Sequence, residues 1–214
     1  MTFTRRDTLA LGAAASVLTL CGVSGAFAQA GTQYDEAKLM APNGLPDHAT
    51  GSDDAKVTVI EYASPTCPHC AAFNNDVYPQ FKEQYIDTGK VKFIVRPFVR
   101  NVLDAVVFML AEAAGPDKYH TVVDTYFKTQ SQWVSAQNPR DSILAIAKQL
   151  GFTEESFNTA LENQALFAGM ESVRKQAIDD FGLTGTPTFY INGKQLTGES
   201  TVEGLAAEID PLLA

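Results

Sequence analysis

The sequence is poor in cysteine: Cys21, Cys67 and Cys70 are the only three among its 214 residues. A structural zinc site needs four ligands, and no second cysteine pair exists to complete one. His48 and His120 lie far apart along the chain, so their spacing does not suggest a ligand pair. We therefore predict no metal site, and the close spacing of Cys67 and Cys70 becomes the feature to explain.

Long apolar runs and basic clusters are missing as well. The longest apolar stretch, near the N-terminus, is too short and too rich in Gly and Ala for a membrane span. No cluster of Lys and Arg stands out in a chain whose net charge is −9, so a nucleic-acid partner is not expected. With 45% hydrophobic and 19% charged residues, the composition is that of a globular domain.

The first residues have the features of an export signal. Arg5 and Arg6 precede a short apolar segment that ends in the small-residue motif AFA. This pattern predicts a signal peptide over residues 1–28, with cleavage after Ala28 or, alternatively, after Ala30. The stretch TRRDTLA partly matches a twin-arginine signal, so both the twin-arginine and the general export route stay open. We expect the mature protein in the periplasm.

The first half of the mature chain predicts a β-α-β unit. Residues 29–52 contain Gly, Pro and Asp and indicate a loose N-terminal arm. Residues 56–62, KVTVIEY, are rich in β-branched side chains and predict a buried strand. A helix with a kink near Pro79 follows, and residues 90–98 predict a second strand. Strand, helix and strand in this order form a β-α-β unit.

The middle of the chain changes to a helical pattern. Apolar residues recur at helical spacing within 101–114, and a second helix is expected over 116–129. Asn138 is a predicted N-cap, with Pro139 in the first helical position. We therefore expect residues 99–165 to be an all-helical block inserted after the two strands. Trp133 within it is expected to pack in the core.

The last part of the chain returns to strands. Residues 188–191 predict a strand, and the Asn-Gly pair that follows predicts a hairpin turn to a returning strand over 194–197. Ser200 and Glu203 have the spacing of a capping box at the start of a final helix.

Four roles are conceivable for Cys67 and Cys70. The metal site is disfavoured above, and covalent haem would need a His directly after the second Cys, where Ala71 stands. A structural disulfide would close a very short loop and would constrain the unfolded chain little. The sequence therefore favours a redox-active pair.

The position of the pair explains how it could react. Cys67 follows a strand and lies at or just before a helix N-terminus, where free N–H groups and the helix dipole favour negative charge. Pro68 suits the first helical turn, and a protonated His69 would add positive charge. Such surroundings lower a thiol pKa from about 8.5 to roughly 3.5–7.5. Cys67 is then the attacked sulfur and Cys70, one turn further, the more buried resolving thiol.

Two distant residues are further candidates for this site. Pro187 lies at the mouth of a late strand, and its peptide-bond isomer stays open from sequence alone. Glu61 shares a strand face with Val57 and Val59. As a buried carboxylate with a raised pKa it would shuttle a proton for Cys70, and as an exposed edge residue it would have no role. The pattern alone favours neither reading.

Taken together, these motifs resemble those of the DsbA-like thiol:disulfide oxidoreductases. The resemblance extends over about residues 50–214 and rests on CPHC at a helix start, a Thr-Pro pair before a late strand, an export signal and a helical block. It implies an α/β protein with a thioredoxin fold and an inserted all-helical domain. The thioredoxin-like part would comprise residues 53–98 and 166–214, and the insertion residues 99–165.

The resemblance also implies roles for individual residues. Cys67 and Cys70 would form the redox-active disulfide, Pro187 would be a cis-proline facing it, and Glu61 would be a buried proton-transfer residue. Thr186 departs from the best-known DsbA oxidases, which have Val before the proline. Thr at this position also resembles the isomerase and reductase branches, which usually carry an N-terminal oligomerisation segment. About 25 mature residues without heptads precede the fold here, which favours a monomeric oxidase.

The expected function is the introduction of disulfides into reduced or unfolded exported proteins. The resemblance implies a quinone-linked membrane partner of the DsbB type that reoxidises the pair, and no bound cofactor. Two alternatives stay open: an isomerase or reductase kept reduced by a membrane donor, and a chaperone or binding module without turnover.

Overall fold

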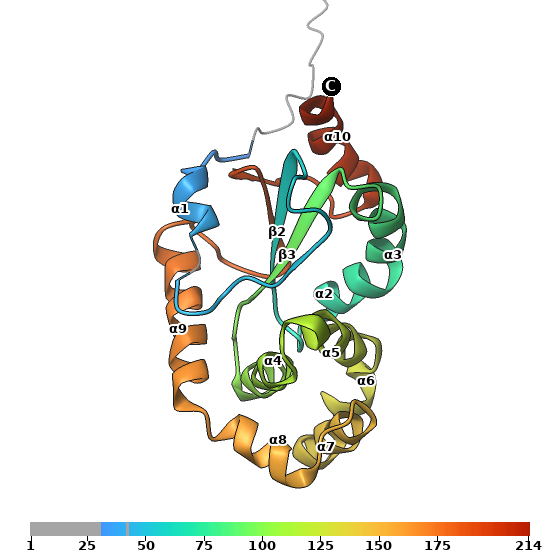
Figure 1. Cartoon of the computed structure of the whole chain (residues 1–214), viewed down its shortest axis with the longest axis vertical. Helices are drawn as coiled ribbons and strands as arrows, with labels where there is room; N and C mark the ends of the chain where they lie inside the picture. Colours follow the sequence, from blue (N-terminus) through green and yellow to red (C-terminus); the bar gives the residue numbers. More distant parts are fainter. Residues whose placement is uncertain (1–30, 42) are drawn as a thin grey trace, which may run out of the picture.

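The structure is a computed structural model that describes residues 31–41 and 43–214 (Figure 1). The predicted signal peptide over residues 1–28 lies outside the described residues. In chain order the elements are α1 (Glu36–Met40), β1 (Ala49–Thr50), β2 (Val57–Ala63), α2 (Pro68–Ala72), the π-helical η1 (Phe73–Val77), α3 (Tyr78–Phe81), the π-helical η2 (Lys82–Ile86), β3 (Val91–Pro97), α4 (Val102–Ala114), α5 (Pro116–Lys128), α6 (Gln130–Trp133), α7 (Pro139–Gln149), α8 (Glu154–Leu161), α9 (Gln164–Asp179), β4 (Thr188–Ile191), β5 (Lys194–Gln195) and α10 (Val202–Leu213).

The described strands form a mixed sheet in the order β1-β3-β2-β4-β5. β2 and β3 are parallel, and the other neighbours are antiparallel. Figure 1 shows α1 and α9 on one side of β2 and β3, with α3 and α10 on the other. A central strand covered on both faces is buried along nearly its whole length and is mostly apolar, and β2 has this burial pattern.

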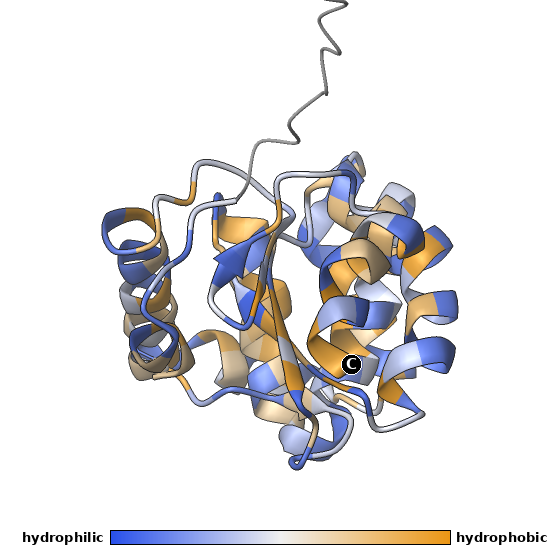
Figure 2. Cartoon of the chain, turned by 90° about the horizontal axis from the view of Figure 1, so that it is seen from above, coloured by the Kyte–Doolittle hydropathy of each residue, from blue (hydrophilic) through white to orange (hydrophobic). Residues whose placement is uncertain are grey.

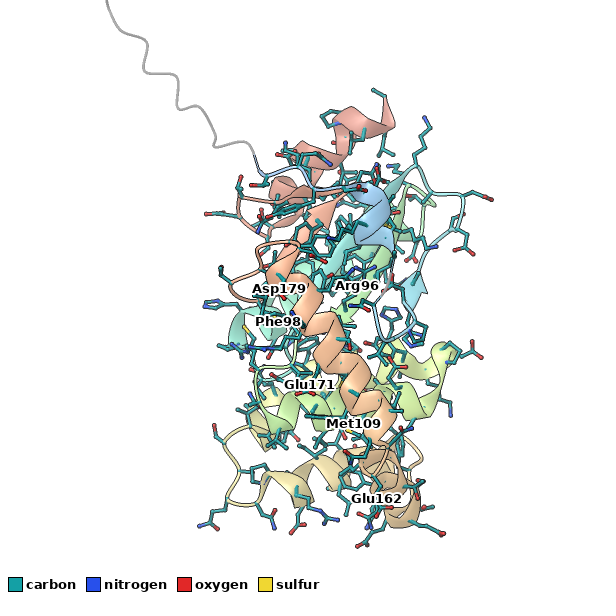
Figure 3. The ribbon with its side chains drawn as sticks, turned by 90° about the vertical axis from the view of Figure 1, so that its left-hand side faces the viewer. Arg96, Phe98, Met109, Glu162, Glu171 and Asp179 are labelled. Carbon is teal, nitrogen blue, oxygen red and sulfur yellow. The ribbon has the colours of Figure 1, made fainter. Side chains whose placement is uncertain are left out.

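The expected helical block is present between β3 and the later strands. Helices α4 to α8 lie beyond one end of the sheet (Figure 1). α9 then runs from this helical part back along the sheet, past Met109 and Phe98 (Figure 3), and packs against both α4 and β3. It begins at Gln164, so the boundary expected between residues 165 and 166 falls inside one continuous helix.

One continuous hydrophobic core supports both parts of the chain. In Figure 2 the hydrophobic positions of helices and strands gather toward the interior. Trp133 is fully buried, as predicted, and its indole N–H donates to the Tyr126 carbonyl at 2.9 Å. None of the described helices is both long and apolar enough to cross a membrane.

The prediction of a loose N-terminal arm over residues 29–52 is wrong for the part of it that the structure describes. Ala49–Thr50 pairs with β3 as an edge strand, and Gln33 forms a bridge with Lys194 at the opposite edge. Leu39 is 1% exposed. Backbone pairing and apolar burial therefore fix this segment, and its Gly and Pro residues mark turns between the fixed points.

The helix after the cysteines is irregular near Pro79, as predicted. Pro79 has no N–H to donate, and it stands at the start of α3 between two π-helical turns. The Tyr78 N–H donates to the Phe73 carbonyl five residues back, which is the wider π spacing. The predicted single kink is thus a pair of widened turns.

The hairpin is confirmed, and the cap of the last helix is wrong by one residue. Asn192 and Gly193 both have positive φ, 43° and 83°, as a tight hairpin turn requires. The N-cap of α10 is Thr201, whose hydroxyl accepts from the Gly204 N–H at 3.1 Å. The Ser200–Glu203 capping box therefore does not form, because the helix begins one residue later.

Candidate active site

The cysteine pair lies where β2 is followed by α2. Cys67 is the N-cap of α2, with an extended backbone (φ −81°, ψ 120°), and Pro68 opens the helix as predicted. Cys67 is 2% exposed and Cys70 is 0% exposed. Cys70 is thus the more buried thiol, as predicted, but the difference in exposure is small. Both are free thiols. The structure therefore represents the reduced form, and the Cys67–Cys70 disulfide stays a prediction.

The two thiols differ in their hydrogen bonds and in how strongly burial acts on their pKa values. A hydrogen bond from Cys70 is the largest factor in lowering the pKa of Cys67 to about 4. Burial opposes this shift, and the Thr186 side chain and the backbone N–H groups of Cys70 and His69 assist it. Burial and the bond to Cys67 raise the pKa of Cys70 far above its ordinary value. At neutral pH Cys67 is therefore a thiolate and Cys70 a thiol.

The side chain of His69 is not the source of this effect. Pro68 and His69 are both exposed at the surface, and His69 acts on the Cys67 sulfur through its backbone N–H. The sequence argument placed the positive charge on the ring, whereas the geometry assigns the contribution to the peptide group.

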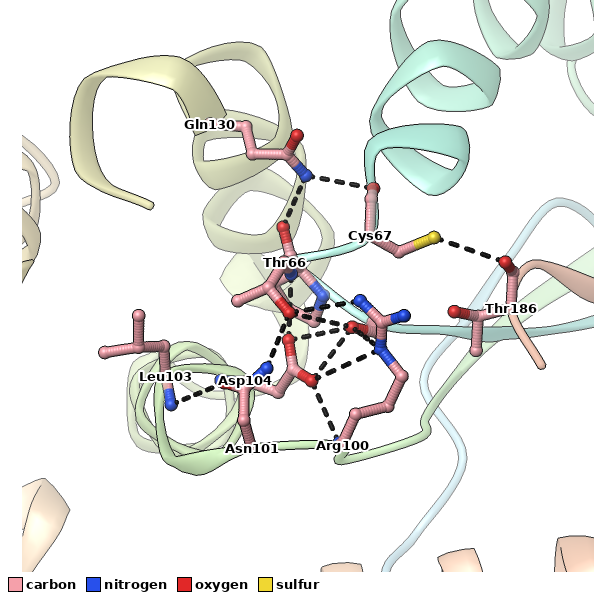
Figure 4. Close-up of polar contacts among 10 residues, drawn as sticks. Thr66, Cys67, Arg100, Asn101, Leu103, Asp104, Gln130 and Thr186 are labelled. Carbon is pink, nitrogen blue, oxygen red and sulfur yellow. Dashed lines mark hydrogen bonds and ion pairs between the residues drawn. The ribbon is translucent and has the colours of Figure 1, made fainter. Parts of the chain in front are cut away.

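The loop before β4 meets the sulfur from the other side. In its thiol form Cys67 donates through Sγ to the Thr186 carbonyl oxygen, which lies 3.2 Å away across 119 positions of sequence (Figure 4). The Thr186–Pro187 peptide bond is cis, which is the isomer that the resemblance implies. The Thr186 hydroxyl is buried and makes no hydrogen bond of ordinary geometry among the described residues. Fold topology thus brings CPHC and Thr-Pro together.

Glu61 is a buried carboxylic acid and not an exposed edge residue. It is 3% exposed, and its register partners are Val95 on β3 and Phe189 on β4. Its Oε1 has no hydrogen-bond partner among the described residues. Burial, and then the charge on Cys67, raise the pKa of Glu61 to about 8.

Glu61 lines a cavity that is also bordered by the inserted helix α5. Its volume is about 570 Å³, and its lining includes Glu61, Tyr78 and His120. The charge of Glu61 also contributes to the raised pKa of Cys70. Glu61 therefore interacts electrostatically with Cys70, and it also lines a cavity large enough to hold water.

The sequence argument missed a buried polar cluster on the insertion side of the loop. Asp104 of α4 is fully buried and accepts hydrogen bonds from Ser64 and Thr66, which immediately precede the cysteines. Gln130 of α6 donates to the carbonyls of Pro65 and Cys67. The only sequence signal was Asp104 three residues after Asn101, which is also the ordinary spacing of a helix cap.

The described residues contain no group of three or more His, Cys, Asp or Glu side chains that could hold a metal ion. The arrangement is instead a thiolate, a neighbouring thiol, a buried acid and a Thr-Pro loop. These groups are suited to thiol–disulfide exchange, in which a thiolate attacks a disulfide and the leaving sulfur needs a proton.

Comparison of the sequence with known proteins points the same way. A protein-family model described as thioredoxin matches residues 44–211. A Rickettsia bellii protein named "Putative protein-disulfide oxidoreductase" is 31% identical over 169 residues, which are 77% of this chain and 63% of that protein. The chain thus spans less than two thirds of this relative. Disulfide bond formation protein D of Bacillus subtilis is 28% identical over 155 residues, 67% of each chain.

Solved structures support the same fold. Alpha-DsbA1 of Wolbachia pipientis matches with a TM-score of 0.75 and 27% identity, over 84% of this chain and 96% of that one. BdbD of Bacillus subtilis in its oxidised form matches with a TM-score of 0.71 and 21% identity, over 86% and 97%. At that lower identity the likeness concerns the fold alone. The predicted thioredoxin fold with added helices is confirmed.

Proposed function

Because the chain belongs to the thioredoxin family, we propose that it is a thiol:disulfide oxidoreductase that introduces disulfides into reduced, exported proteins. The observation that carries this proposal is the contrast between the two thiols. With a pKa of about 4, Cys67 is a stabilised thiolate, whereas Cys70 holds its proton. A stabilised thiolate favours the reduced form, and a disulfide whose reduced form is favoured is a strong oxidant.

The proposed reaction starts from the oxidised enzyme. A substrate thiolate attacks the Cys67 sulfur, the Cys67–Cys70 bond breaks, and Cys70 leaves as a thiolate that takes up a proton. A second substrate thiolate then attacks the substrate sulfur of the mixed disulfide, and Cys67 leaves as a thiolate. The substrate gains one disulfide and loses two electrons, and the enzyme gains those two electrons as a dithiol.

Glu61 is the proposed proton donor to the Cys70 leaving group. Its pKa of about 8 keeps it protonated at neutral pH, and its charge affects Cys70. A leaving thiolate in an apolar site is costly until it is protonated. The cavity beside Glu61 provides the space through which water would return the proton.

The partners follow from this chemistry. The reduced enzyme must lose two electrons before the next cycle, and a quinone-linked membrane protein of the DsbB type is the proposed acceptor. The periplasm is the proposed location on the basis of the predicted signal peptide over residues 1–28. The enzyme is proposed to act as a monomer.

The decisive measurement is the reduction potential of the Cys67–Cys70 couple, by equilibration with glutathione. A value near the oxidising end, about −120 mV, supports a disulfide donor. A value near −270 mV, like that of thioredoxin, would refute it and favour the second candidate, a reductase or isomerase, which Thr186 suggests. A chaperone without turnover would keep its function in Cys67→Ser, whereas the proposed enzyme loses it.

The assignment of the two thiols has its own test. The reduced protein is treated with iodoacetamide between pH 3 and pH 8. We expect labelling of Cys67 with a half-maximal rate near pH 4, because its pKa is lowered to about 4. Cys70 should stay unlabelled over the same range, and labelling of Cys70 first would overturn the assignment.

A further inference from the structure

The turn that precedes the reactive cysteine is held by the inserted helices at every residue. The Cys67 N–H donates to the Ser64 carbonyl at 2.9 Å and closes a turn over residues 64–67. Within it the Ser64 hydroxyl and the Thr66 N–H both donate to Asp104, each at 2.8 Å. The inserted helix α4 therefore binds the turn from one side (Figure 4).

Gln130 binds the same turn from α6, the second contact of the insertion. Its side-chain amide donates to the Pro65 carbonyl at 2.7 Å and to the Cys67 carbonyl at 2.9 Å. The Cys67 carbonyl also accepts the Ala71 N–H at 3.1 Å in the first turn of α2. Gln130 thus stands at the junction of the turn and the helix.

We propose that Gln130 and Asp104 are positioning residues through which the inserted domain sets the reduction potential of the Cys67–Cys70 couple. This inference rests on the thiol–disulfide chemistry proposed above, but not on its direction in the cell. The two residues act through the turn over 64–67, which fixes where the Cys67 sulfur stands relative to its hydrogen-bond donors.

The reduced and the oxidised form depend to different degrees on the hydrogen bonds from Asp104 and Gln130 to the turn. In the reduced form the Cys67 sulfur is stabilised by Cys70 and by the N–H groups of His69 and Cys70, and these contacts require a fixed N-cap geometry. In the oxidised form a covalent bond joins Cys67 to Cys70 and restrains the same geometry. Loss of these hydrogen bonds therefore destabilises the reduced form more than the oxidised form. The disulfide then becomes a weaker oxidant.

Gln130 gives the cleaner test, because it is neutral. Replacing Asp104 also removes a negative charge near the site, which by itself would favour a thiolate and oppose the effect of a loosened turn. Gln130→Met keeps the length of the side chain and removes only the amide. Gln132→Met is the matched control, because Gln132 is exposed on the same short helix.

The experiment compares the equilibrium constants of the wild type, Gln130→Met and Gln132→Met with glutathione. We expect Gln130→Met to be about three- to tenfold less oxidising, as for the loss of neutral hydrogen bonds of modest strength. A tenfold change corresponds to about 30 mV. Gln132→Met should match the wild type. Gln130→Asn, whose shorter amide cannot span both carbonyls, should change the constant in the same direction.

Thermal unfolding of both redox forms separates positioning from simple support. If the proposal is right, Gln130→Met lowers the Tm of the reduced form more than that of the oxidised form. If Gln130→Met lowers both equally and keeps the wild-type equilibrium constant, the contacts are structural only and the proposal is wrong. A wild-type potential near that of thioredoxin would instead refute the oxidase function and leave the difference between the variants intact.

Discussion

Two buried acidic residues lie in the two elements next to the cysteine pair, Glu61 in β2 and Asp104 in α4, and they differ in their partners. Asp104 accepts hydrogen bonds from Ser64, Thr66 and the Arg100 N–H and is fully buried. Glu61 is 3% exposed, with apolar register partners and one oxygen that is not hydrogen-bonded within the described chain. The two acids are similarly buried. Asp104 holds a loop through its hydrogen bonds, whereas the free Oε1 of Glu61 fits the proposed proton transfer.

The largest effect is expected from Asp104→Ala. The change leaves the Thr66 and Arg100 N–H groups without their acceptor, and a buried donor left unsatisfied costs about 1–3 kcal/mol, or about 2–6 kcal/mol for the two. We expect the free energy of unfolding in urea to fall by about that amount. Asp104→Asn keeps the shape and should cost less, about 1–3 kcal/mol.

The control for Asp104 is Asp54→Ala, since Asp54 is exposed. A surface change of this kind should stay within about 0.5 kcal/mol. If Asp104→Ala is no more destabilising than Asp54→Ala, the cluster does not hold the loop, and the contrast between the two acids fails.

The second effect concerns Glu61 and the pH dependence of stability. Its pKa is raised to about 8 from 4.5, so its protonated form fits the fold. The stability that it contributes is complete below about pH 4.5 and is lost as pH rises through about 8. Glu61→Gln should remove this decline, measured as the difference from the wild type in urea unfolding of the reduced protein at pH 5, 7 and 8.5.

The same variant tests proton transfer. Glu61→Gln should slow the release of Cys70 from the disulfide at pH 7 by tenfold or more, because general acid catalysis is typically worth about 100- to 10,000-fold. Stopped-flow mixing of the oxidised enzyme with a dithiol peptide measures this rate. An unchanged rate together with an unchanged pH profile would make Glu61 a buried residue without a role.

The smallest expected effect is a change in the pKa of Glu61 between the reduced and the oxidised protein. The charge on Cys67 is the second cause of its raised pKa, and oxidation removes that charge. We expect the pKa of Glu61 to be lower in the oxidised protein than in the reduced one. Carboxyl carbon NMR of glutamate-labelled protein measures both values, and Glu61→Gln identifies the signal.

The sequence predicted those parts of the site that local chemistry determines. CPHC after a strand, Pro187 just before β4 and the Asn-Gly hairpin follow from short-range rules, and the structure has each of them. Glu61 was undecided, because burial of one strand face depends on helices far away in sequence. Asp104 and Gln130 were missed, because their bonds to the turn span 38 to 65 positions.

The errors have equally local causes. Ser200 and Thr201 are adjacent, and either hydroxyl is able to cap a helix, so the choice depended on where the hairpin ends. The N-terminal arm looks like a loop by composition, yet Ala49–Thr50 and Gln33 bind opposite edges of the sheet. Pairing with the edge of a sheet is made by backbone groups, so it leaves little pattern in the side chains of the sequence.

The two edges of the sheet have a consequence for how the folded molecule associates with other chains. β1 and β5, the outermost strands, are each only two residues long. A long free edge offers a row of unpaired backbone groups with which another extended chain would form extra strands, and aggregation would follow. Edges this short leave little to extend. The sheet is therefore a poor template for edge-to-edge association with another extended chain.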